Sequence, residues 1–360
     1  MVSNEEVIQN IKDSLEMYSQ TELRRLVSDL TSIGLVAKTT NLFNSDAILV
    51  EDKTDKRIIF DTLDSNFTDT FKVIDSFEIN KLYKYGTMFY VNSIDGISED
   101  FFLPFKLENE EITTPNTTLH MVNGRFILKI IQILHGVKLG SNKEPIRYTN
   151  RYPMIAIFHP ESKIVEIKVH TISSVLQNEE RDFYHKKIAE VRTGIETQLG
   201  VNLEPVDLYT LTNFISEQKE DGVKVSSQKM ELASGGNATL DSGVDSEEII
   251  LPILGELIKI IDDNANLFSD NDTSLKIKDL LEEFISETIE TSELPWMSLR
   301  WPNQVKAKSI QVKFIFNHYS SYDYTMMQFY NNSRGMEGMG YVADYLIQQL
   351  KKLSSGSSDS

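Results

Sequence analysis

A predicted β-hairpin at residues 153–170 constrains the fold of this chain more than any other segment. Two alternating apolar runs flank His-Pro-Glu-Ser at residues 159–162, where the proline presets the backbone angle that the second position of a turn needs. Side chains alternate between the two faces of a strand, so Glu166, Lys168 and His170 of the second run share one face. We therefore predict a hairpin with a row of polar side chains on its second strand.

This polar row is the strongest candidate for chemistry in the sequence. A Glu-x-Lys pair on a strand is half of a magnesium-dependent nuclease site of the PD-(D/E)xK type, so Glu166 and Lys168 are the candidate catalytic residues. The other half is an upstream aspartate, because Mg²⁺ binds convergent carboxylates. Residues 101–181 contain no aspartate, and Glu144 is the carboxylate that could replace it. Binding is therefore our first interpretation of this strand, and a nuclease that uses Mg²⁺ is the alternative.

The charge of the chain is segregated along the sequence. The net charge is −18, which argues against a general nucleic-acid coat. Residues 123–200 nevertheless carry 12 basic and 8 acidic side chains, whereas residues 241–293 carry 3 basic and 15 acidic ones. Such asymmetry can orient a partner, although solvated helix faces are the simpler explanation. Nucleic acid, if it binds at all, is expected at the central basic segment, and the acidic segment is expected to face a protein partner or solvent.

Candidate binding residues come from three places in the sequence. The second predicted helix carries two arginines, and the order of two helices followed by a small hairpin resembles a winged-helix module. In so acidic a segment, a helix that only packs within the N-terminal domain is the simpler interpretation. The C-terminal part carries several tyrosines near an arginine. If these tyrosines are exposed, they could stack on bases or form a protein interface, although core packing is the simpler interpretation. The candidates are Arg24, Arg25, Lys168, His170, Lys186, Lys187, Tyr322 and Arg334.

Local patterns predict the remaining elements. Two amphipathic helices open the chain, the second capped by Ser19 and Glu22, and a hairpin of residues 47–50 and 57–60 follows. Residues 65–135 look rich in strands, including 83–92 and 101–107, with 126–135 either a strand or a short buried helix. Helices are expected at 179–199 and 205–219, strands at 223–232 and 296–301, a second hairpin at 309–330, and a final helix to about residue 353.

An acidic pair of helices is predicted at residues 249–261 and 275–289. The connecting Asp-Asp-Asn-Ala-Asn at 262–266 resembles part of a calcium loop, but Leu267 occupies the place of the required glycine and Thr273 that of the bidentate acid. We therefore expect a polar connection and no metal site. The histidines at 159, 170 and 185 could form a metal-binding cluster, but we expect them to be ordinary surface residues.

These patterns predict an α+β fold with an N-terminal helical pair, mixed or antiparallel sheets, an acidic helical hairpin and a C-terminal β-hairpin plus helix. The chain has no cysteine, and its N-terminus does not read as a signal peptide, so we expect a cytoplasmic protein without a membrane segment. The predicted divisions are an N-terminal domain at 1–122, a central domain at 123–233, a linker or exposed loop at 234–246, an acidic and C-terminal domain at 247–353, and a disordered tail at 354–360.

Function is predicted only at the level of class. We expect a non-enzymatic binding or adaptor subunit of a prokaryotic complex, with a protein partner and with anti-phage defence as the suggested setting. No cofactor is expected outside the nuclease alternative. A second alternative is an acidic inhibitor in which residues 241–293 mimic the charge of nucleic acid.

Overall fold

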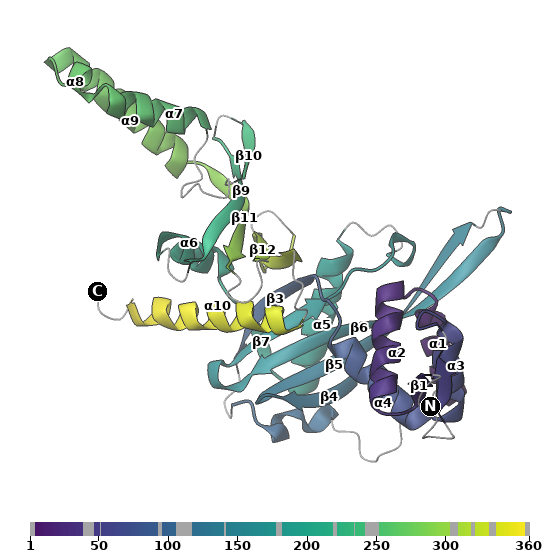
Figure 1. Ribbon diagram of the computed structural model, residues 1–360. Helices are drawn as coiled ribbons and strands as arrows, with labels where there is room; N and C mark the ends of the chain where they lie inside the picture. The colour runs from purple at the N-terminus through teal and green to yellow at the C-terminus, as the bar shows by residue number, and fades with distance from the viewer. Residues whose placement is uncertain are drawn as a thin grey trace. The chain divides into compact units, whose positions relative to one another are not determined.

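The computed structural model describes residues 4–38, 47–50, 52–92, 96–105, 117–139, 142–177, 182–218, 222–233, 235–241, 252–302, 309–317, 321–330 and 336–356. The chain divides into two compact units, Met1–Glu204 and Pro205–Ser360, which we call unit 1 and unit 2 and describe separately. This division is coarser than the predicted domain organisation. Figure 1 shows the helices and strands of each unit.

Unit 1 combines a helical module with an antiparallel sheet (Figure 1). Its elements in chain order are α1 (Asn4–Leu15), α2 (Gln20–Ser32), β1 (Val36–Lys38), β2 (Ile48–Val50), α3 (Lys56–Ser65), α4 (Phe67–Ile79), β3 (Tyr85–Asn92), η1 (Glu99–Phe105), β4 (Thr117–Val122), β5 (Arg125–Leu139), β6 (Pro145–His159), η2 (Pro160–Ser162), β7 (Ile164–Val169), η3 (Ser174–Leu176), α5 (Phe183–Leu199) and β8 (Asn202–Pro205).

The helical module has its own apolar core, to which α1, α2, α3 and α4 all contribute. The predicted capping box at the start of α2 is present, since Ser19 and Glu22 each bond to the backbone of the other. The predicted hairpin of residues 47–50 and 57–60 is wrong. β2 pairs in parallel with β1 instead, and residues 57–60 lie in α3. The Asp55 side chain caps the N-terminus of α3 by accepting a hydrogen bond from the backbone amide of Arg57.

Two other segments of unit 1 differ from the predicted strands. Residues 67–79 form α4, because their apolar residues recur at helical rather than alternating spacing. The predicted strand at 101–107 is a 3₁₀-helix as far as it is described, to Phe105. The tight turn brings Phe101 and Phe102 to the same neighbour, Phe158, with ring centroids 6.2 and 4.9 Å away. A strand would have sent these two adjacent rings to opposite faces.

The sheet of unit 1 has the strand order β3-β7-β6-β5-β4, with every neighbour antiparallel, and β8 also pairs with β3. The predicted hairpin of residues 153–170 is therefore confirmed as β6, the single turn η2 and β7. Lys163 closes the turn in the left-handed region, at φ 51°. Residues 126–135, whose sequence fits a strand or a short buried helix, belong to β5.

Helices cover both faces of this sheet. On one face α4 reaches Lys129 of β5 and Arg151 of β6 with its carboxylates. On the other face α5 packs its Phe183 ring 5.7 Å from the ring of Tyr152. Because both faces are covered, all six residues of β7 are buried, including its charged ones. Gly200 ends α5 in the left-handed conformation that the sequence predicts for a glycine stop.

Unit 2 contains a second antiparallel arrangement, with the strand order β10-β9-β11-β12-β13. The predicted strands at 223–232 and 296–301 and the predicted hairpin at 309–330 are confirmed in it, while the helix predicted from residue 205 begins at Leu208. Its elements are α6 (Leu208–Gln218), β9 (Lys224–Glu231), β10 (Asn237–Asp241), α7 (Pro252–Asp263), α8 (Ala265–Phe268), α9 (Asp272–Glu290), β11 (Glu293–Trp301), β12 (Ile310–Ile315), β13 (Met326–Tyr330) and α10 (Met336–Gly356).

The acidic helical pair is confirmed as α7 and α9, joined through the short α8, and we call residues 252–290 the helical hairpin. Figure 1 shows it extending from the strands β9 and β10 of unit 2. Asp262 and Asp263 lie within α7 and not in a loop, so the segment that resembled a calcium loop does not have that form. The range 234–246, predicted as a linker or exposed loop, contains β10. Residues 357–360 of the predicted tail lie outside the described residues.

The α+β fold class is confirmed. Neighbouring strands along the two strand orders given above are antiparallel, and β1 and β2 pair in parallel. Helices pack against the sheet of unit 1 and form a separate hairpin in unit 2.

Candidate functional site

The polar row of β7 forms a buried cluster of ion pairs. A Glu166 carboxylate oxygen lies 2.8 Å from the Lys168 ammonium, and the other lies 2.6 Å from Nε2 of His159. His159 ends β6, and it reaches Glu166 because the two strands are register neighbours there. Glu166 and Lys168 are 1% and 0% exposed. The predicted row thus exists, but Glu166 and Lys168 bind each other. The expectation that the histidines at 159 and 185 are surface residues is wrong, since both are buried.

Its neighbours keep Glu166 ionised. Burial acts to raise the pKa of Glu166, but the Lys168 ammonium and the His159 ring outweigh it and hold that pKa at about 2. A carboxylate held by a cation on one oxygen and by an imidazole on the other has little capacity left for Mg²⁺. The geometry is that of a structural ion pair within the sheet.

The carboxylate that could complete a magnesium site lies far from this cluster. Glu144 directly precedes Pro145, the first residue of β6, whereas Glu166 pairs with Ile157 near its other end. Twelve residues of strand separate those two positions, or about 40 Å at the usual rise per residue. Across the described residues, no three acidic or histidine side chains gather closely enough to hold a metal ion.

A second buried charge cluster joins α4 to the sheet. The Lys129 ammonium contacts Asp75 and lies 2.8 Å from a carboxylate oxygen of Glu78. The Arg151 guanidinium donates to the same Glu78 at 3.4 Å, and the His120 ring lies 2.8 Å from Asp75. Burial raises the pKa of Glu78, but Lys129 and then Arg151 lower it more strongly, to about 2. Two carboxylates against two cations leave this cluster balanced and structural.

The predicted binding residues do not form one surface. Arg24 and Arg25 are exposed on α2, and Arg25 donates to the Asn80 carbonyl at 3.3 Å. Lys187 is buried on α5 and pairs with Glu190 at 2.9 Å, whereas Lys186 is exposed.

The remaining candidates are equally scattered. The His170 ring stacks on Tyr152, with centroids 4.8 Å apart. Tyr322 is half-buried, with its ring centroid 5.7 Å from that of Tyr324. Arg334 lies outside the described residues. Of all the predicted site residues, the structure brings Glu166 and Lys168 into direct contact.

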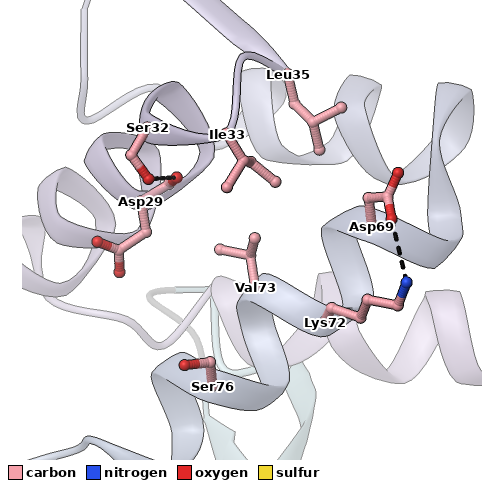
Figure 2. Close-up of a pocket in the computed structure, with 8 residues that line it drawn as sticks. All are labelled: Asp29, Ser32, Ile33, Leu35, Asp69, Lys72, Val73 and Ser76. Atoms are coloured by element: carbon pink, nitrogen blue, oxygen red, sulfur yellow. Dashed lines mark hydrogen bonds and ion pairs between the residues drawn. The ribbon is translucent and has the colours of Figure 1, made fainter.

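A surface groove of about 630 Å³ lies between α2 and α4 (Figure 2). Ile33 and Val73 point toward each other across it, and Ile33 is 51% exposed. Asp69 at its rim is paired with Lys72 at 3.4 Å. Its walls combine apolar and acidic side chains without a convergent set of polar groups, so they do not define a ligand chemistry.

Exposed apolar side chains are concentrated on the helical hairpin. In α9, residues Ile277, Leu280 and Phe284 follow the spacing that places side chains on one helix face, and they are 48%, 64% and 55% exposed. Further members of the set are Ile260, Leu267, Leu275 and Ile289. Other residues of the same helices, among them Ile261 and Ile285, pack in one core with Met230 of β9 and Leu240 of β10. A row of exposed aliphatic and aromatic side chains of this kind typically marks an interaction surface.

A second exposed surface lies at the end of the β5–β6 ribbon. β4 pairs with β5 as far as Ile130 and β7 pairs with β6 from Met154 onward, so among the described strands the rest of the ribbon is two-stranded. Figure 1 shows it projecting beyond the sheet. We call residues 137–139 and 142–147 the β-arm. Its Val137, Leu139 and Ile146 are 60%, 66% and 46% exposed.

Sequence reasoning considered the acidic helical pair as a site only through its charge, and it missed the apolar row of that hairpin and the β-arm. The signal for the helical hairpin was present, because α9 has apolar residues on more of its circumference than one packed face needs. The β-arm had a weaker signal, namely that the apolar run of β5 continues past the length of the neighbouring strand β4.

Comparisons with protein families, with curated proteins and with solved structures found no match to this chain. In the part of the chain that the structure describes, no helix combines the length and the apolar character needed to cross a membrane.

Proposed function

We propose that this protein is a non-enzymatic binding or adaptor subunit that binds a partner protein through the exposed face of its helical hairpin. The observation that carries this proposal is the row formed by Ile277, Leu280 and Phe284, which is exposed although the same hairpin packs on its own unit through Ile261 and Ile285. An apolar row on a helix is the feature that helix-binding partners recognise. The prokaryotic source remains a prediction from composition, and no residue pattern carries the suggested role in anti-phage defence.

The same row favours protein binding over nucleic-acid mimicry. Residues 252–290 carry 10 acidic and 3 basic side chains, which alone would suit a mimic of phosphate charge. A mimic presents charge to a basic partner, whereas here large apolar side chains lie between the acids. Contact with them stabilises a complex by removing apolar surface from water, at about 25 cal/mol per Å².

The nuclease alternative gains no support from the arrangement of Glu166 and Lys168, since both side chains are buried and paired. Incubation of the purified protein with DNA and RNA in Mg²⁺ or Mn²⁺ tests it directly. We expect no cleavage. Cleavage that disappears in a folded Lys168→Ala variant would replace the binding proposal with an enzymatic one.

Capture of partners by the immobilised full chain tests the proposed function. We expect a protein of the source cells to be retained at near-equal stoichiometry and to be lost with the hairpin variant Leu280→Lys/Phe284→Lys. The matched control is Leu82→Lys, because Leu82 is 59% exposed and lies in unit 1. Equal retention by all three proteins would show that the hairpin face is not the binding surface.

A further inference from the structure

We propose that the partner of the helical hairpin is the β-arm of a second copy of this chain, an inference that rests on the proposed function and names its partner. Both surfaces expose large aliphatic side chains, and neither set belongs to the core of its own unit. Burial of either surface in an interface would remove apolar area from water, and the charges and apolar side chains of the two surfaces are complementary.

Charge complementarity selects the β-arm as the occupant. The helical hairpin, residues 252–290, has 10 acidic and 3 basic side chains, a net charge of −7. Residues 137–147 have 3 basic and 1 acidic side chains, a net charge of +2, in a chain whose total is −18. Two hairpins face to face would bring like charges together, which costs free energy, whereas hairpin and arm attract.

The apolar geometry of the two surfaces also matches. On α9, the exposed Glu283 and Glu287 lie beside the row that contains Leu280 and Phe284. A partner for this row needs apolar side chains next to a cation.

The β-arm presents that combination. Val137 and Arg147 are register partners across the ribbon, so they share a face, and Leu139 lies two residues further along the same face. Val137 and Leu139 can cover the apolar row while the exposed Arg147 pairs with a carboxylate at its edge.

Contact between two different patches makes the association heterologous. In a pair of copies, the copy whose hairpin is bound still has a free β-arm, and the copy whose β-arm is bound still has a free hairpin. Such contacts extend into a chain of subunits or close into a ring, and they do not stop at a symmetric dimer. This property gives the proposal a distinctive test.

The test is sedimentation velocity of the full chain up to about 200 μM, above the micromolar Kd typical of a small interface. We expect species larger than a dimer. A hairpin variant, Leu280→Lys/Phe284→Lys, and an arm variant, Val137→Glu/Leu139→Glu, should each be monomeric alone. An equimolar mixture should form a 1:1 heterodimer and nothing larger, because one intact arm meets one intact hairpin.

Charge reversal provides the second, milder measurement. Arg147→Glu and Glu283→Lys should each weaken association at least about tenfold, and the two together in one chain should restore it at least in part. The control Leu82→Lys should associate like the unchanged protein. Circular dichroism of every variant confirms that the fold is retained, so a monomeric result cannot come from unfolding.

The outcomes separate this proposal from the one on which it rests. An unchanged protein that stays monomeric overturns self-association, while hairpin-dependent capture of a different protein would still support the proposed function. Association that survives the arm variant but not the hairpin variant overturns the arm as partner and indicates contact between hairpins. Both proposals are overturned if the hairpin variant and the arm variant each still self-associate and if the hairpin variant still retains the captured partner protein.

Discussion

At the scale of single residues, we expect the buried ion pair of Glu166 and Lys168 to be sensitive to substitution. Glu166→Leu leaves a fully buried ammonium without its carboxylate. We expect this variant to lose about 3–5 kcal/mol of unfolding free energy, as measured by urea denaturation, because breaking one side of a buried pair strands the other charge. The control is Glu161→Gln, at the exposed turn between β6 and β7, which should change the unfolding free energy by less than about 0.5 kcal/mol.

The double variant Glu166→Leu/Lys168→Met completes this prediction. It removes both charges and replaces them with apolar groups of similar volume, so we expect it to be more stable than Glu166→Leu alone. A double variant that loses the sum of the two single effects would show that the two side chains do not act as a pair.

The low pKa of Glu78 predicts how stability depends on pH. Lys129 and Arg151 overcome the effect of burial and hold the pKa of Glu78 at about 2, below the ordinary value of 4.5. The folded state therefore binds this proton less readily than the unfolded state, and the stabilisation is present above pH 4.5 and is lost as pH falls toward 2. We expect the loss to be on the order of 3 kcal/mol.

Urea unfolding at pH 7, 5, 4 and 3 measures this dependence. Glu78→Gln should be less stable than the unchanged protein at pH 7, and its stability should fall less steeply between pH 5 and 3. Parallel curves for the two proteins would mean that Glu78 does not contribute the expected proton linkage.

At the scale of elements, a glycine sets how closely η3 approaches β5. A Cβ on Gly136 would lie 2.4 Å from the Val175 carbonyl oxygen, a backbone atom that cannot rotate away. We expect Gly136→Ala to cost about 1–3 kcal/mol of unfolding free energy, because η3 or the strand must shift. Gly194→Ala is the matched control, since a Cβ there meets nothing within 4 Å inside α5. It should stabilise the protein by about 0.5–1 kcal/mol.

Elements were predictable from sequence where one periodicity dominates, as in the hairpin of β6 and β7, where a proline turn separates two alternating runs. Prediction failed at α3, because the four apolar-rich residues 57–60 fit a strand as well as a helix, and the Asp55 cap was the decisive signal.

The ion pair within β7 could be predicted from the sequence, since Glu166 and Lys168 are two residues apart on one strand face. The cluster of Glu78 and Lys129 was not, because 51 residues separate them and local spacing carries no information on such a contact.

At the scale of the whole molecule, the sequence overstates how basic the central segment is. Residues 123–200 carry 12 basic side chains, but Lys129, Arg151, Lys168 and Lys187 are at most 6% exposed, and each is paired with a carboxylate. Cations that are neutralised inside the protein release no counterions from DNA, which is the main source of non-specific affinity. The surface that nucleic acid meets is therefore more acidic than the sequence of this segment suggests.

We accordingly expect no measurable binding of a 30-base-pair duplex at about 150 mM salt by fluorescence anisotropy, given the total charge of −18. At about 20 mM salt, residual binding should depend on the β-arm, whose Lys143 and Arg147 are both exposed. Lys143→Glu/Arg147→Glu should abolish it, whereas Arg24→Glu/Arg25→Glu should not. Salt-resistant binding that requires the two arginines of α2 would instead favour the nucleic-acid role considered for that helix, and would count against a protein partner as the main ligand.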